Sequence, residues 1–258
     1  MKSILVTGMS GLIGNAVRRQ LSGKYELAAL SRRKVEGIKS RQADIRDLDN
    51  ILPAFKGIDM VVHLAGVFRG KISWKDYLES NIVGTYNVFE AARIAGVRRV
   101  IFASSGATVA GWEREPPFDA IVQGRYEAVP PQWPMLTHQT PLWPAGIYGA
   151  TKVWGEALGR AYSDSYGISV ICLRIGFVNP EDRPIERRHF AVWCSQRDIA
   201  RMVEQCIEAP PTVKYEIFYV TSRNRWGFRD LEHAKEVVGF LPEDSADAFG
   251  DSTHTALR

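Results

Sequence analysis

The first fourteen residues contain the pattern that most constrains the fold of this chain. Residues 4–6 form an apolar run typical of a strand buried on both faces, and Gly8, Gly11 and Gly14 follow it. Helical character then continues through Leu21. A strand, a glycine-rich turn and a helix N-terminus together let backbone N–H groups approach a pyrophosphate closely. The segment therefore predicts a dinucleotide site, and the alternative is a purely structural turn that needs its glycines for steric reasons.

Composition indicates a globular chain that can bury a sizeable core. The 258 residues are 45% hydrophobic, which suits a single domain over 1–258, with residues 1–176 mainly a dinucleotide-binding core and 177–258 mainly a small substrate-binding part. The net charge of +4 is spread along the chain without a long basic run, so we expect no nucleic-acid partner. Cys172, Cys194 and Cys206 lack metal-ligand spacing and fit buried thiols, which predicts no metal site. Without a signal peptide or a membrane-spanning run, the expected location is the cytoplasm.

Strands alternate with helices along most of the chain. Later strands are expected over 25–30, 60–64, 99–103, 168–173 and 214–220, and later helices over 48–55, 73–95, 145–166, 197–208 and 231–238. This order predicts an α/β, doubly wound Rossmann fold, in which a parallel sheet carries helices on both faces. The ligand site of such a sheet lies at the carboxyl ends of its strands, where Gly8, Ser31, Gly66 and Ser105 fall. The polar tail beyond Phe240 is expected to be loosely held.

Basic residues at the end of the second strand favour NADP over NAD. A carboxylate at this place would accept hydrogen bonds from the free ribose hydroxyls, whereas a guanidinium pairs with a 2′-phosphate. The chain offers Ser31, Arg32 and Arg33, with no carboxylate until Glu36. We therefore expect NADP, with NAD as second choice; the alternative is an ordinary exposed basic turn. Asp44 could accept a hydrogen bond from the adenine amino group or cap the following helix.

Residues 112–147 form an excursion rich in proline and tryptophan. Its prolines, at positions 116, 117, 130, 131, 134, 141 and 144, are predicted to exclude regular helix and central strand. A loop this long within a compact domain is usually functional, so a lid or substrate rim near the active site is one interpretation. The other is a proline-stiffened segment packed on the surface.

A serine, a tyrosine and a lysine form the candidate catalytic group. Tyr148 and Lys152 are four residues apart and share one helix face, and Ser105 lies at a strand end. A phenol has a pKa of about 10, which a nearby ammonium and an oxidised nicotinamide would lower. Tyr148 would then remove a proton from a carbinol while the cofactor takes the hydride, or supply a proton to a carbonyl in reverse. Ser105 would hold the reacting oxygen, and Lys152 would also fix the nicotinamide ribose.

The ordered motifs resemble the short-chain dehydrogenase/reductase superfamily, in its extended branch, the NAD-dependent epimerase/dehydratase family. The resemblance rests on residues 7–14, 63–66 and 173–176, with Asp44, Asn81, Ser104-Ser105 and the pair Tyr148 and Lys152. It implies catalysis by Ser105, Tyr148 and Lys152, with Ser104 as the alternative serine because Gly106 looks like an extra residue in the family's spacing. The cofactor contacts that it implies are Gly8, Ser10, Gly11, Leu12, Ile13, Gly14, Asp44, Ile45, Leu64, Ala65, Gly66, Ser104, Tyr148, Lys152 and Ile175. The family also suggests a homodimer built through helices 73–95 and 148–166.

Within that branch, the last third of the chain resembles uronate dehydrogenases and related sugar dehydrogenases, through residues 174–176, 188–195 and 238–245. In that subgroup, an arginine at the position of Arg188 binds the substrate's carboxylate, and a phosphate would suit the same guanidinium. Gly106-Ala107, Phe177 and the longer excursion over 112–147 depart from the subgroup. These departures suggest a less polar or larger substrate than a free hexuronate.

The sequence thus predicts an NAD(P)-dependent oxidoreductase acting on an alcohol, hemiacetal or carbonyl of a small sugar-like or apolar substrate. One alternative is a nucleotide-sugar epimerase or dehydratase that holds its cofactor tightly. The other is a non-catalytic NADP-binding sensor, although such modules often lack the tyrosine–lysine pair.

Overall fold

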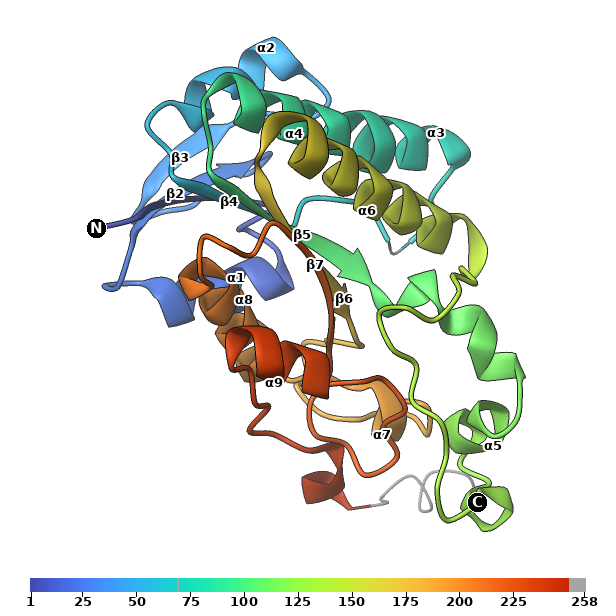
Figure 1. Cartoon of the computed structure of the whole chain (residues 1–258). Helices are drawn as coiled ribbons and strands as arrows, with labels where there is room; N and C mark the ends of the chain where they lie inside the picture. The colour runs from blue at the N-terminus through green and yellow to red at the C-terminus, as the bar shows by residue number, and fades with distance from the viewer. Residues whose placement is uncertain (69, 251–258) are drawn as a thin grey trace.

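The computed structural model, which describes residues 1–68 and 70–250, contains one seven-stranded sheet (Figure 1). All strand pairs are parallel, and their spatial order is β3-β2-β1-β4-β5-β6-β7. The strands are β1 (Ser3–Thr7), β2 (Glu26–Ser31), β3 (Lys39–Gln42), β4 (Met60–His63), β5 (Arg99–Ser105), β6 (Ser169–Ile175) and β7 (Tyr215–Val220). The predicted Rossmann sheet is confirmed. The sequence analysis missed β3, because this short edge strand is polar and partly exposed.

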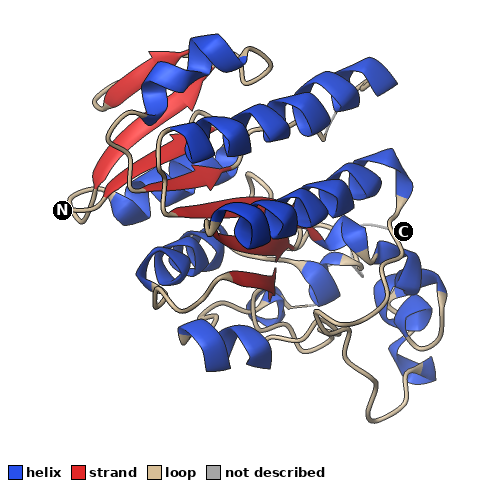
Figure 2. Cartoon of the chain, turned by 45° about the horizontal axis from the view of Figure 1, so that its top comes forward, coloured by secondary structure: helices blue, strands red, loops and turns tan. Residues whose placement is uncertain are grey.

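Helices cover both faces of the sheet, as predicted (Figures 1 and 2). One face carries α1 (Leu12–Leu21), α8 (Gln196–Glu208) and α9 (Glu232–Val238); the other carries α2 (Leu48–Ile51), α4 (Gly84–Ile94) and α6 (Gly146–Tyr166). Alternate strand residues point to opposite faces, so Ile4 and Val6 join the first core layer and Leu5 joins the second. Burial on both sides explains the uninterrupted apolar runs of the central strands.

The helix expected over 73–95 is interrupted by a stretch of wider winding. It consists of α3 (Trp74–Asp76), a π-helical segment η2 (Tyr77–Val83) and then α4. Ser73 begins it with a capping box, in which its side chain accepts a hydrogen bond from the N–H of Asp76 and the Asp76 carboxylate accepts from the N–H of Ser73. π-Helical turns inside helices frequently mark functional sites, and η2 contains Asn81.

The excursion over 112–147 is more regular than predicted. It includes the helix α5 (Phe118–Gln123) and the 3₁₀ turns η4 (Ala110–Arg114) and η5 (Tyr126–Ala128), while η3 (Gly106–Thr108) precedes it. The expectation that prolines exclude helix was wrong for α5, because Pro116 and Pro117 lie before its first turn, where no N–H is needed. Phe118 packs on Phe228 with ring centroids 5.0 Å apart. The excursion is therefore packed against the last third of the chain.

The segment after Phe240 is anchored as far as residue 250, so the expectation of a loose tail was wrong there. The Asp244 carboxylate accepts a hydrogen bond of 2.6 Å from the Ser195 hydroxyl, and Ala246 is fully buried at the start of η6 (Ala246–Phe249). Residues 251–258 lie outside the described part of the chain. The three cysteines are buried free thiols, as predicted. Within the described residues, no helix is both long and apolar enough to cross a membrane, and the division of the chain at residue 176 stays a prediction.

Candidate active site

The glycine-rich turn brings three pieces of backbone into close contact. Gly8 has a φ of +70°, and a Cβ there would lie 2.8 Å from the backbone nitrogen of Ala65 after β4. A Cβ at Gly14 would lie 2.5 Å from the Cα of Met9. Only glycine therefore allows β1, the turn and α1 to pack this closely. Gly11 is the N-cap of α1 and provides no side-chain cap, so the first N–H groups of this helix are available to an anion.

A cavity of about 610 Å³ lies beside this turn, at the carboxyl ends of β1, β2 and β4. The residues predicted to bind the pyrophosphate and adenosine all line it: Gly8, Ser10, Gly11, Leu12, Ile13, Gly14, Ser31, Arg32, Arg33, Asp44, Ile45, Leu64, Ala65 and Gly66. The sequence analysis missed seven further lining residues: Leu30, Ala43, Val67, Phe68, Ser80, Ala103 and Val178. The glycine cradle and the volume of this cavity fit a dinucleotide.

The end of the cavity that is predicted to hold the adenosine is basic. Arg32 and Arg33 both line it and are exposed. The carboxylate of Asp44 is held by Arg46, through a side-chain contact of 2.9 Å and a backbone N–H contact of 3.0 Å. Burial acts to raise the pKa of Asp44, but its hydrogen bonds with Arg46 outweigh that effect and lower the pKa. The capping alternative for Asp44 was wrong, because Asp47 caps α2 by accepting from the N–H of Asn50.

A second cavity, of about 430 Å³, adjoins the first and shares Ile13, Leu64 and Gly66 with it. It contains the remaining predicted site residues: Ser104, Ser105, Tyr148, Lys152, Ile175 and Arg188. The structure thus brings the predicted catalytic residues together at the end of the predicted cofactor cavity.

The two neighbouring serines of β5 have different surroundings. Ser105 hydrogen-bonds with the hydroxyl of Tyr148, and its own oxygen accepts the N–H of Ala107 at 3.1 Å. Ser104 is buried and donates to the Glu156 carboxylate at 2.6 Å. Ser104 is thus engaged by Glu156, and Ser105 is the serine that lies beside Tyr148.

Tyr148 and Lys152 begin α6 on the same side, as their spacing predicted. Burial raises the pKa of Tyr148 to about 12, with the Ser105 hydrogen bond opposing the rise. The sequence analysis expected Lys152 to lower the pKa of Tyr148, but within the protein alone this pKa is raised. The expected effect of an oxidised nicotinamide comes from the cofactor. Lys152 is buried, its Nζ donates to the carbonyl of Ala103 at 2.8 Å, and burial lowers its pKa to about 8.

Asn81, on the π-helical segment, ties the strand end after β4 to α6. Its side-chain oxygen accepts the N–H of Val67 at 2.8 Å, and its amide nitrogen donates to the Thr151 hydroxyl at 3.2 Å. A Cβ at Gly66 would lie 3.7 Å from the Nζ of Lys152. The wider turn of η2 thus brings Asn81 and α6 together at the junction of the two cavities.

Arg188, just before α7 (His189–Val192), shares a carboxylate with a second arginine. Its Nε and Nη2 donate to Glu113 at 2.6 and 2.8 Å, and Nη2 of Arg229 lies 3.3 Å from the same carboxylate. Arg229 also lines the second cavity. The sequence analysis missed Glu113 and Arg229. The glycine at position 106 was the sequence signal for a group packed closely after Ser105, because a Cβ there would overlap the guanidinium of Arg229.

A model of the NAD dependent epimerase/dehydratase family matches residues 4–238. This chain belongs to that family. An NAD-dependent glucose-6-phosphate dehydrogenase of Haloferax volcanii is 32% identical over 256 residues, covering 95% of this chain and 95% of the relative. A uronate dehydrogenase of Agrobacterium fabrum is 34% identical over 254 residues, covering 96% of this chain and 87% of the relative. The crystal structure of uronate dehydrogenase from Agrobacterium tumefaciens superimposes with a TM-score of 0.83 at 30% identity, covering 100% of this chain and 90% of that one.

The family assignment confirms the resemblance found in the sequence, and this member of the epimerase/dehydratase family is an NAD(P)-dependent oxidoreductase. A UDP-galactose 4-epimerase structure has a TM-score of 0.72 but only 20% identity, which shows a shared fold alone.

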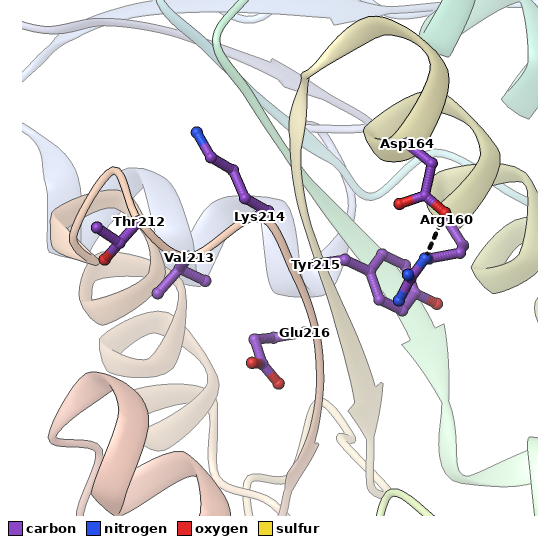
Figure 3. A pocket seen from close by; sticks show the side chains of 7 residues that line it. All are labelled: Arg160, Asp164, Thr212, Val213, Lys214, Tyr215 and Glu216. Carbon is purple, nitrogen blue, oxygen red and sulfur yellow. Dashed lines mark hydrogen bonds and ion pairs between the residues drawn. The ribbon is translucent and has the colours of Figure 1, made fainter.

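Another depression, of about 360 Å³, lies at the opposite edge of the sheet (Figure 3). It is formed by residues 212–216 at the amino end of β7 and by Arg160 and Asp164 of α6, which form an exposed ion pair of 2.7 Å. The predicted cofactor cavity lies instead at the carboxyl ends of the strands. The depression contains none of the predicted site residues.

Proposed function

We propose that this chain is an NADP-preferring dehydrogenase acting on a hydroxyl, hemiacetal or carbonyl carbon of a small sugar-like substrate. The observation that carries the proposal is the grouping of Ser105, Tyr148 and Lys152 where the two cavities meet. The sugar-like substrate is supported by relatives named as glucose-6-phosphate, L-arabinose and uronate dehydrogenases.

Tyr148 is the proposed acid–base group. When bound, the nicotinamide accepts or delivers the hydride. In oxidation, the Tyr148 oxygen takes the proton of the substrate hydroxyl, and in reduction it returns a proton to the carbonyl oxygen. Ser105 holds the same substrate oxygen by a hydrogen bond. Nζ of Lys152 lies 5.7 Å from the centroid of the Tyr148 ring, and together with the positive charge of an oxidised nicotinamide it would favour the phenolate.

The preference for NADP rests on Arg32 and Arg33 at the end of β2. Both line the adenosine end of the cavity, and a guanidinium pairs with a 2′-phosphate more strongly than with a free hydroxyl. The carboxylate of Asp44 lines the same end but is bonded to Arg46. One relative, an L-arabinose 1-dehydrogenase of Haloferax volcanii, is named as using NAD(P)(+).

A homodimer through the helices on one face is also proposed. Trp74, Tyr86 and Ile94 expose large apolar side chains along α3 and α4, and Tyr166 does so at the end of α6. An exposed apolar stripe of this kind is typical of a surface that is covered by another chain.

A direct assay tests the proposed reaction. Purified protein is mixed with NADP⁺ or NAD⁺ and a panel of aldoses, sugar phosphates and uronates, and formation of the reduced cofactor is followed by absorbance. Substrate-dependent reduction that is faster with NADP⁺ supports the proposal. Conversion of a nucleotide-sugar without net cofactor reduction would identify an epimerase or dehydratase instead, and cofactor binding without any conversion would favour a sensor.

A further inference from the structure

Arg229 is a buried cation whose charge is only partly compensated. It is 3% exposed, and among the described residues its Nε has no hydrogen-bond partner although that atom is buried. Its carboxylate contact, Glu113, lies 3.3 Å from Nη2. Burying a guanidinium without full pairing is costly. Its position on the wall of the substrate cavity therefore requires an explanation.

The local charges do not cancel. Glu113 accepts from Nε and Nη2 of Arg188 and lies near Nη2 of Arg229, so one carboxylate serves two guanidinium groups and these three side chains together carry one positive charge. The exposed Glu186 carboxylate also acts on Arg188 but pairs with His189. Nη1 of Arg188 and both Nε and Nη1 of Arg229 lie outside these contacts. Glu113 is not among the described residues that line the cavity, whereas both arginines are. The Glu113 carboxylate thus contacts both guanidinium groups from outside the cavity lining.

The chain makes room for Arg229 close to the reacting group. The guanidinium packs on Gly106, where any Cβ would overlap it. Gly106 directly follows Ser105, whose hydroxyl bonds with Tyr148. Most of the remaining cavity wall is apolar and includes Phe68, Ala110 and Phe177. Lys152, the other cationic side chain that lines the cavity, donates to the carbonyl of Ala103 beside Tyr148, so the two arginines are the guanidinium groups on this wall that can recognise an anion.

We propose that Arg229 is a second anion-binding residue of the substrate cavity, and that with Arg188 it holds one negative charge of the substrate, a carboxylate. Glu113 is a positioning residue that orients both guanidinium groups and sets their combined charge. A net charge of one matches a carboxylate better than a phosphate monoester, whose charge is about −1.5 to −2 at neutral pH. This inference rests on the proposed function, because it assigns the substrate class of the same cavity.

Calorimetric titration tests the inference without requiring turnover. The protein carries Tyr148→Phe and is saturated with NADP⁺, and the three probes are glucose, glucuronate and glucose 6-phosphate, which differ only at the group on carbon 6. We expect glucuronate to bind at least about tenfold more tightly than glucose, since charge-assisted hydrogen bonds are among the strong ones. Equal affinity for glucuronate and glucose, or binding of neither, would overturn the inference.

Variants assign the preference to Arg229. Arg229→Met should weaken glucuronate binding about tenfold or more and leave glucose within about twofold, while Arg229→Lys should retain part of the preference because it keeps the charge but not the planar fork. Gly106→Ala, which displaces the guanidinium without removing it, should reduce the same preference. Unchanged NADP⁺ affinity shows that each variant is folded. An unchanged glucuronate preference in both Arg229→Met and Gly106→Ala would contradict the assignment.

Glu113→Gln tests the role of the shared carboxylate. Removing its charge leaves two positive charges, so the affinity for glucose 6-phosphate should rise relative to that for glucuronate; an unchanged ratio would refute the charge-setting role. Wild-type protein that binds glucuronate selectively but reduces no cofactor would contradict only the proposed function. Turnover with NADP⁺ but without any preference for anions would contradict only this inference.

Discussion

The hydroxyl of Ser104 and the carboxylate of Glu156 form a buried hydrogen bond of 2.6 Å between β5 and α6. The same carboxylate accepts Nε and Nη2 of Arg174 on β6, each at 2.9 Å. Both charged side chains are almost fully buried. Removing one partner of such a buried pair strongly destabilises the folded protein. The network connects the helix of Tyr148 and Lys152 to the two strands beneath it, and it engages the hydroxyl of Ser104.

The two serines should therefore respond differently to substitution. Ser105→Ala should lower kcat, because the reacting oxygen loses its hydrogen-bond donor, and should leave the melting temperature nearly unchanged. Ser104→Ala is the matched control, and it should cost about 1–3 kcal/mol of unfolding free energy by leaving a buried acceptor less satisfied. Steady-state kinetics and urea unfolding of both variants measure the difference. A larger loss of kcat in Ser104→Ala would reverse the assignment.

Tyr148→Phe should reduce turnover by about 10²–10⁴-fold, the usual contribution of general acid–base catalysis. The ring and its contacts with Phe68 and Tyr77 remain, so the dissociation constant for NADP⁺ should change little. Stopped-flow hydride transfer and cofactor titration check the two halves of the prediction. Turnover close to the wild-type rate would rule out this acid–base role.

Arg32→Ala should weaken NADP⁺ much more than NAD⁺. Loss of a charge-assisted hydrogen bond costs about 1.5–3 kcal/mol, which corresponds to roughly ten- to hundredfold in the dissociation constant. Arg46→Ala serves as a comparison, because Arg46 holds Asp44 and Glu79 and is not among the described residues lining the cavity. An equal loss for both cofactors in Arg32→Ala would mean that Arg32 makes no contact with the 2′-phosphate.

Lys152 should give the folding equilibrium a pH dependence above neutrality. Burial lowers its pKa from 10.5 in the unfolded chain to about 8. Between pH 8 and 10.5 the unfolded chain then binds more protons at this site, so the contribution of Lys152 to the unfolding free energy rises as the pH increases. Its destabilising effect is fully present below pH 8. Urea unfolding of wild-type protein and Lys152→Met should therefore differ most at pH 7 and converge towards pH 10. A constant difference would contradict the lowered pKa.

Trp74→Glu should dissociate the proposed homodimer, because it places a charge in the middle of an apolar contact. Trp74 is 61% exposed in the single chain, so the substitution should leave the folded monomer intact. Phe249→Glu, at an exposed apolar side chain on the distant η6, is the control. Sedimentation velocity distinguishes the two species. A wild-type protein that sediments as a monomer would refute the dimer.

Local patterns were sufficient for much of the fold. Each predicted strand overlaps a strand of the sheet, because burial on both faces requires a continuous apolar run. Such patterns did not predict β3, because its polar residues pair at the edge of the sheet. They also did not predict the wider winding of η2, which accompanies the tertiary contacts of Asn81. The short helix α5 was missed because its prolines precede the helix, where they are tolerated.

The sequence by itself determined the strand–turn–helix at Gly8–Gly14, the basic end of β2 and the pair Tyr148 and Lys152. Each of these features depends on only a few neighbouring residues: the conformational freedom of glycine, the end of a strand, or the spacing along one helix face. A short stretch of sequence is therefore enough to identify them. Tertiary structure alone decided which serine reaches Tyr148 and which arginines share Glu113. Glu113 lies 75 positions from Arg188 and 116 from Arg229, and a charge cluster assembled over such separations depends on how distant segments pack, which no local pattern records.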